Sequence, residues 1–148
     1  MAYKEKSMIS PNMIKKFLSP VWSKWSEILE NSGCEIIILD SDGYIGDLIP
    51  LWIESRINCT TPVEVAAGNN LVEYRKKFGK NIAYIGGIDK RAISKGEKII
   101  EKEMESKVPF LIKEGGYIPS CDHGVPPDIS LKNFIYYCKI LAKLTGWI

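Results

Sequence analysis

Residues 120–128 gather the side chains of this chain that are best suited to chemistry. The stretch holds the only histidine, His123, together with Cys121, two aspartates and the pair Pro126-Pro127. Histidine exchanges protons near neutral pH, and imidazole and thiolate both bind zinc. A strand cannot continue through two prolines, so we expect a strand to end near Ser120 and these side chains to lie on a loop.

Two further polar clusters follow apolar segments. Asp40-Ser41-Asp42-Gly43 follows residues 34–39, and Gly86-Gly87-Ile88-Asp89-Lys90-Arg91 follows residues 81–85. Residues two apart in an extended chain point to the same side, so both aspartates of the first cluster are expected to face one edge. The first cluster is also ordinary turn chemistry, and the second is compatible with a helix start held by ion pairs.

Segments with helical and extended patterns alternate along the chain. The apolar run at residues 36–39 is typical of a strand covered on both faces, as in a parallel sheet. Ser94 and Glu97 fit a capping box, and Pro109 is expected to break the helix that follows. Helices are predicted at residues 10–29, 47–54, 71–78, 94–108 and 130–142, and strands at 34–39, 56–60, 81–85 and 116–119. This order predicts an α/β fold with polar clusters at the carboxyl ends of parallel strands.

Composition excludes several classes of function. The chain has 148 residues, 45% of them hydrophobic, which predicts a single domain over residues 1–148. A net charge of +2, without a basic run interleaved with aromatics, argues against a nucleic-acid partner. No apolar run predicts a membrane span or signal peptide, so we expect a cytoplasmic protein. Among the four cysteines, Cys34, Cys59 and Cys138 lie in apolar segments, which predicts buried free thiols.

Five segments of the chain resemble motifs of one protein family. They are Met8-Ile9-Ser10-Pro11, residues 39–43, residues 58–64, residues 86–91, and Gly115-Gly116-Tyr117-Ile118-Pro119 through Pro127. In this order they are similar to the carboxyl half of the uroporphyrinogen decarboxylase superfamily, which also contains corrinoid-linked methyltransferases. The resemblance implies the carboxyl-terminal half of a TIM (β/α)8 barrel, with about four parallel strands and a site at their carboxyl rim. Because half a barrel exposes two sheet edges, we expect a missing half-barrel or a second copy as partner.

The resemblance first implies a metal-assisted methyltransferase that moves a methyl group to or from a corrinoid carried by a partner protein. In the zinc enzymes of the superfamily the fifth strand typically ends in His-x-Cys, whereas this chain has Asp40-Ser41-Asp42 there. Zinc accepts oxygen, nitrogen and sulfur ligands. The candidate ligands are Asp40, Asp42, Glu64, Cys121 and His123. His123 and Asp89 are the candidate catalytic residues, and Lys90, Arg91 and Tyr117 are expected to bind an anionic small-molecule substrate.

Three alternatives remain open. The first is uroporphyrinogen decarboxylase of porphyrin biosynthesis, which needs no cofactor and would place His123 on the pocket wall. The second is a non-catalytic subunit that completes a barrel with a partner. The third is a flavodoxin-like sheet, although no glycine-rich phosphate loop follows the first predicted strand. A lone histidine is also more often a packing or surface residue than a ligand, and Glu64 can merely cap or pair locally.

Overall fold

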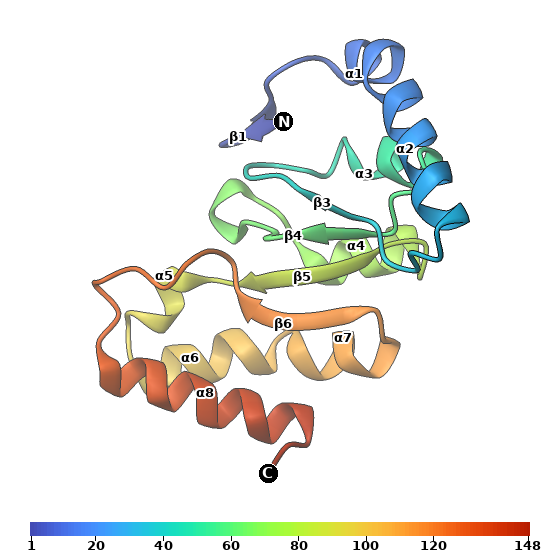
Figure 1. The fold of residues 1–148 in the computed structure, drawn as a ribbon. Coiled ribbons are helices and arrows are strands. Elements are labelled where there is room, and N and C mark those ends of the chain that lie inside the picture. The colour runs from blue at the N-terminus through green and yellow to red at the C-terminus, as the bar shows by residue number, and fades with distance from the viewer.

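A four-stranded parallel sheet forms the centre of the computed structural model, which describes residues 1–148 (Figure 1). Its strands, in spatial order, are β3 (Ile38–Asp40), β4 (Cys59–Thr61), β5 (Ala83–Ile88) and β6 (Tyr117–Cys121). Ile38 lies opposite Cys59, and Cys59 lies opposite Ala83. The alternation of strands and helices and the parallel sheet are therefore confirmed.

Helices connect the strands, as right-handed crossovers require. Before β3 lie a short antiparallel pair, β1 (Ala2–Tyr3) and β2 (Lys6–Ser7), and then α1 (Pro11–Phe17) and α2 (Ser19–Asn31). The remaining helices are α3 (Ile49–Glu54), η1 (Val65–Ala67), α4 (Leu71–Phe78), α5 (Lys90–Ile93), α6 (Glu97–Glu105), α7 (Val108–Glu114) and α8 (Leu131–Thr145). Ser10 and Ser130 cap α1 and α8 through their side chains, as predicted.

Several predicted boundaries are wrong for local reasons. The helix expected at residues 10–29 is two helices, because Pro20 lies at the start of α2 and cannot continue α1. The capping box is absent, since Gly96 precedes α6 without a side-chain cap. The strand expected to end at Ile85 continues through two glycines to Ile88. Pro109 does separate α6 from α7, as expected.

Two apolar clusters form the core on the helix-covered face of the sheet. The larger contains Ile37, Trp52 and Tyr84, and the smaller joins Ile88 to Met104 and Tyr137 from α6 and α8. Because side chains alternate along a strand, the other face carries the neighbours of these residues. The core therefore covers only one face of the sheet.

The opposite face of the sheet is uncovered, which contradicts the prediction that the strand at residues 34–39 is covered on both sides. Ile36 is 66% exposed, Ile38 51% and Ile118 59%. Parallel sheets are normally covered on both faces, so this face is unusual for a parallel sheet.

The cysteines and helices test two further expectations. Cys59 is buried, but Cys34 and Cys138 are exposed, so the prediction of buried thiols is wrong for those two positions. None of the helices combines the length and the apolar character that crossing a membrane would require.

Gly86 provides a test of how closely β5 approaches the loop after β4. Its φ is +106°, and a Cβ atom would lie 1.9 Å from the Pro62 carbonyl oxygen. We expect Gly86→Ala to lower the free energy of unfolding by about 2–4 kcal/mol, because strain and a backbone clash add. Urea denaturation measures this change.

Gly68→Ala is the matched control for this substitution. Gly68 has a φ of +91°, but a Cβ atom added there would meet no other atom within 4 Å. Only the conformational cost of about 1 kcal/mol should remain. Equal losses at both positions would show that the close approach to Pro62 is unimportant.

Candidate functional site

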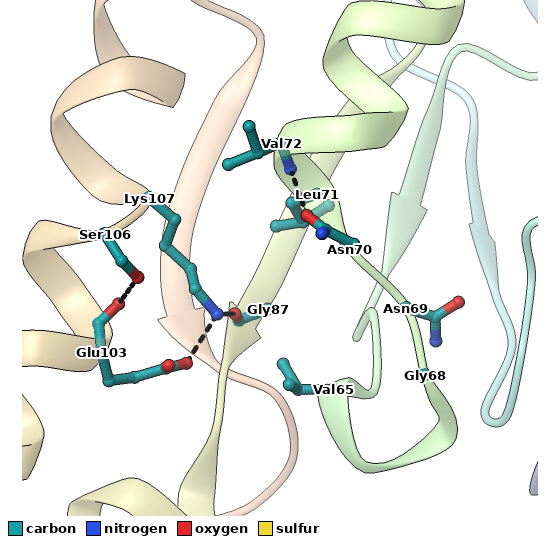
Figure 2. A pocket seen from close by; sticks show the side chains of 10 residues that line it. All are labelled: Val65, Gly68, Asn69, Asn70, Leu71, Val72, Gly87, Glu103, Ser106 and Lys107. Carbon is teal, nitrogen blue, oxygen red and sulfur yellow. Dashed lines mark hydrogen bonds and ion pairs between the residues drawn. The ribbon is translucent and has the colours of Figure 1, made fainter.

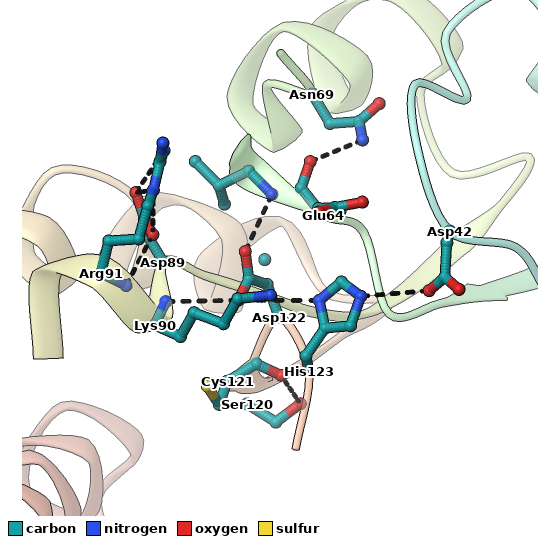
Figure 3. Close-up of polar contacts among 12 residues, drawn as sticks. Asp42, Glu64, Asn69, Asp89, Lys90, Arg91, Ser120, Cys121, Asp122 and His123 are labelled. Atoms are coloured by element: carbon teal, nitrogen blue, oxygen red, sulfur yellow. Dashed lines mark hydrogen bonds and ion pairs between the residues drawn. The ribbon is translucent and has the colours of Figure 1, made fainter. Parts of the chain in front are cut away.

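The loops that follow β3, β4, β5 and β6 meet at one end of the sheet, which we call the rim (Figure 3). His123 follows β6, and its Nε2 atom lies 3.1 Å from Oδ1 of Asp42, which follows β3. β3 and β6 are the two edge strands of the sheet. The rim therefore joins a histidine and a carboxylate from opposite edges.

Asp122 holds three of these loops together. Its side chain is fully buried, and its carboxylate accepts hydrogen bonds from Val65 N at 3.0 Å and Lys90 N at 3.2 Å. Burial raises the pKa of Asp122, and the two backbone hydrogen bonds offset this only in part. The sequence analysis did not predict this role. The signal was strand alternation, which points Asp122 to the opposite side from Cys121.

Asn69 joins the loops after β3 and β4. Its Nδ2 group donates to Gly43 O at 2.8 Å and to Glu64 O at 2.7 Å. Its Oδ1 atom accepts from Ile45 N at 3.0 Å and from the Tyr74 hydroxyl at 2.7 Å. A side-chain amide has two donors and two acceptor sites, so this buried residue is fully satisfied. The sequence carried no signal for it, because Asn69 has the pattern of an ordinary turn residue.

His123 lies between two carboxylates. Its Nδ1 atom is 4.0 Å from Asp122 Oδ1 and has no hydrogen-bond partner, while Nε2 contacts Asp42. The His123 side chain is 28% exposed and that of Asp42 63% exposed, so the pair is open to a small molecule. An imidazole held by a carboxylate can donate or accept a proton.

Asp89 and Arg91 form an ion pair at the start of α5. Asp89 caps α5 by accepting from Arg91 N at 2.8 Å, and the Arg91 guanidinium binds both oxygens of the same carboxylate. Burial raises the pKa of Asp89, but the hydrogen bonds and charge of Arg91, together with the charge of Lys107, outweigh it, so the pKa is lowered. Asp89 is therefore held as a carboxylate.

Glu103 and Lys107 tie α6 to the end of β5. Lys107 Nζ lies 2.6 Å from Glu103 Oε1 and donates to Gly87 O at 3.1 Å. Glu103 also accepts from Asp89 N at 2.8 Å. The side chains of Glu103 and Lys107 are largely buried, at 17% and 16% exposed. They line one wall of a cavity of about 560 Å³, and Asn70 and Val72 line the opposite wall (Figure 2).

Cys121 and Tyr117 point away from the rim histidine. Cys121 packs against the smaller core cluster, and burial raises the pKa of its thiol, which disfavours the thiolate that zinc requires. Tyr117 begins β6, packs against both clusters and donates its hydroxyl to Gly86 O at 3.0 Å. Metal binding by Cys121 and substrate binding by Tyr117 stay predictions, and the structure gives the two side chains these packing roles.

The five predicted metal ligands are not gathered into one site. Glu64 Oε2 accepts from Gly43 N at 3.0 Å, which places it beside Asp42, and Asp40 ends β3 without an ion pair. No three His, Cys, Asp or Glu side chains lie together in a way that could hold a metal ion. The residues of this chain alone therefore do not fit a zinc site.

No protein-family model matches the chain, and no curated protein matches it either. The resemblance to the uroporphyrinogen decarboxylase superfamily therefore depends on the five sequence motifs alone. What the rim can do chemically follows from its own contacts, above all the one between His123 and Asp42.

Removal of the Asp122 carboxylate tests whether this residue organises the rim. Asp122→Ala should lower the free energy of unfolding by about 3 kcal/mol, because two partly buried N–H groups lose their acceptor and the buried carboxylate is replaced by a void. Asp122→Asn should cost about 1–2 kcal/mol, since one acceptor oxygen remains. Asp128→Ala, at an exposed position of the same loop, is the control and should change stability little. A change below about 1 kcal/mol in Asp122→Ala would contradict this role.

The pH dependence of stability tests the Asp89–Arg91 pair. Because the pKa of Asp89 is lowered from its usual 3.8, its stabilisation is present above that pH and is lost as the pH falls through the lowered pKa. Asp89→Asn should remove this dependence and cost about 0.5 kcal/mol at neutral pH, because the exposed guanidinium is screened. Acid titration of the unfolding free energy measures both. Arg91→Ala should make the free energy of unfolding less dependent on pH in the acid range. If that dependence is unchanged, the assignment is contradicted.

Proposed function

We propose that residues 1–148 form the carboxyl-terminal half of a (β/α)8 barrel of the uroporphyrinogen decarboxylase superfamily. Four parallel strands alternate with helices, and one sheet face is uncovered, as the inner face of half a barrel would be. The motifs at residues 39–43 and 86–91 lie at the carboxyl half of β3 and β5 and in the loops that follow, and the motif at residues 115–127 spans β6 and the loop after it. The polar cluster is at the end of the sheet where barrel enzymes bind substrate.

The reaction that this geometry supports best is metal-free acid–base chemistry on a carboxylate-bearing small molecule, as in the decarboxylation of uroporphyrinogen. The contact of 3.1 Å between His123 Nε2 and Asp42 Oδ1 carries this proposal. In a decarboxylation the bond between carbon and carboxylate breaks, carbon dioxide leaves, and the electron pair that remains on carbon takes a proton. An imidazolium held by Asp42 is a proton donor suited to that step.

Two cations of the rim are candidates to bind substrate carboxylates. Arg91 is engaged by Asp89, whereas Lys90 takes part in none of the ion pairs of the chain. The Lys90 backbone is fixed by Asp122, and Figure 3 shows its side chain in the same cluster as His123. The Lys90 charge acts on Asp122, which adjoins His123, and this supports Lys90 as the group that binds a substrate carboxylate.

Metal-assisted methyl transfer is the second candidate. The observation that favours it is the approach of Asp42, Glu64 and His123 to one rim, since these donor types bind zinc. The zinc would have to take further ligands from outside this chain, because no group of three donors is assembled here. A corrinoid protein would then be the partner that carries the methyl group.

Binding of uroporphyrin, the stable oxidised form of the proposed substrate, tests the first candidate. Fluorescence titration should show binding that is roughly tenfold weaker in Lys90→Ala and in His123→Ala, because each loses a contact worth about 1.4 kcal/mol or more. Lys98→Ala removes an equal charge from the outer side of α6 and is the control. Equal affinity in all four proteins, or no binding at all, would contradict the proposal.

Metal content separates the two candidates. Plasma mass spectrometry of the purified chain should find far less than one zinc per chain if the site is metal-free. About one zinc per chain, lost in both Asp42→Ala and His123→Ala, would favour methyl transfer instead.

A further inference from the structure

The uncovered face of the sheet is a continuous apolar surface. We call it the open face, and it is formed by Ile36, Ile38, Ala83, Ile85 and Ile118 around the buried Cys59, which line a shallow hollow of about 530 Å³ together with Asn58 and Lys80 at the amino end of the strands. Ile38, Cys59 and Ala83 lie opposite one another in register, so a row of apolar residues runs across three strands. A surface of this composition normally lies inside a protein core or an interface.

A groove opens between α2 and the edge strand β3. It has a volume of about 270 Å³ and is lined by Trp22, Trp25 and Leu29 of α2 together with Ile38 and Asp40 of β3. Trp25 is 60% exposed even though it lies over this groove. The β3 edge pairs with no other strand on this side, so its backbone groups are free for a further strand.

A second groove opens between α8 and the other edge strand, β6. It has a volume of about 340 Å³ and is lined by Cys138, Leu141 and Ala142 of α8 together with Ile118 and Pro119 of β6. β6 also has no neighbour on its outer side. Both sheet edges therefore present the same arrangement, an unpaired strand beneath an overhanging helix.

The two end helices carry additional apolar residues at helical spacing. On α2 these are Val21, Trp25 and Ile28, which are 42%, 60% and 54% exposed. On α8, Leu131 is 73% exposed and Ile135 is 45% exposed. Apolar residues three and four apart form a stripe that packs against another helix. The helices at both edges of the sheet therefore each expose an apolar stripe to which no other helix of this chain is packed.

We propose that the open face and both grooves bind one partner, a four-stranded parallel half-barrel that begins and ends with a strand. This inference rests on the half-barrel architecture proposed above. The two outer strands of the partner pair with β3 and β6 beneath α2 and α8, and its inner face covers the isoleucines of the open face. The partner supplies only the three helices that connect its own strands, because α2 and α8 already cover both seams.

A second copy of this chain does not meet that requirement. In a two-fold pair, β6 of one copy would lie beside β3 of the other, and α8 of the first would cover the same seam as α2 of the second. Each seam of a closed barrel holds one helix, so the two helices would collide. The arrangement of helices on this chain therefore selects a complementary half over self-association.

Charge gives the partner a second feature. Asp40 is the only charged residue that lines the groove beneath α2, and it has no ion pair in this chain. A partner strand beside β3 buries this carboxylate in the seam, where an unpaired charge is costly. We therefore expect a lysine or arginine at the carboxyl end of that strand.

The test uses the amino-terminal half of a full-length barrel of the superfamily as probe. One form ends directly after the fourth strand, and the control form retains the helix that follows that strand. Native mass spectrometry and light scattering should show a one-to-one complex of residues 1–148 with the strand-ended form. The helix-extended form should bind roughly tenfold more weakly or worse, because its last helix occupies the position of α2.

Variants of this chain locate the contact. Ile38→Lys on the open face and Trp25→Lys on α2 should each weaken the complex by roughly tenfold or more, because each places a charge in an apolar contact. Both residues are exposed, so the variants should fold, which circular dichroism checks. Ile99→Lys, at a 41% exposed position of α6 that lines neither groove, should leave binding unchanged.

Three outcomes would overturn the inference. They are equal binding of both probe forms, binding of neither form, and a dimer of this chain that Ile38→Lys dissociates. Failure of the proposed function is recognised separately by uroporphyrin titration of the assembled complex. Assembly without porphyrin binding would remove the proposed function and leave the partner inference standing.

Discussion

The buried carboxylate of Asp122 is the constraint on which the rim depends. It lies in a position without solvent and accepts hydrogen bonds from Val65 N and Lys90 N, on the loops after β4 and β5. Its own chain segment continues directly into His123. The carboxylate that binds the loops after β4 and β5 therefore also fixes the backbone position of His123. Asn69 extends this connection to the loop that carries Asp42, so the site is assembled from all four strand ends.

The sequence predicted the architecture well because it depends on patterns within single segments. The order of strands and helices, the parallel sheet, the serine caps of α1 and α8 and the break at Pro109 are all local signals. The coverage of the sheet could not be predicted in this way. An apolar run at residues 36–39 indicates only that both faces avoid water, and not whether this chain supplies both covers.

In the candidate site, too, local features could be predicted and features that depend on the folded chain could not. His123, Asp42 and Asp89 were identified because polar residues at the ends of predicted strands meet at one edge. The direction of each side chain was harder to predict, because a shift of one residue in a strand boundary reverses it. β6 ends at Cys121 and turns that thiol towards the smaller core cluster, a direction that the sequence pattern did not predict. Asn69 was not predictable, since its four partners lie on segments that only the folded chain brings together.

The helices above the sheet edges also bear on how the chain avoids aggregation. An unprotected edge strand accepts almost any extended peptide, which is how sheets aggregate. Here Trp25 overhangs one edge, and Trp147 lines the groove at the other. An added strand must pass beneath a tryptophan, which favours apolar side chains there, apart from a basic partner for Asp40 at the carboxyl end of the strand. We therefore expect these aromatic residues to favour a strand with complementary apolar side chains over indiscriminate edge pairing.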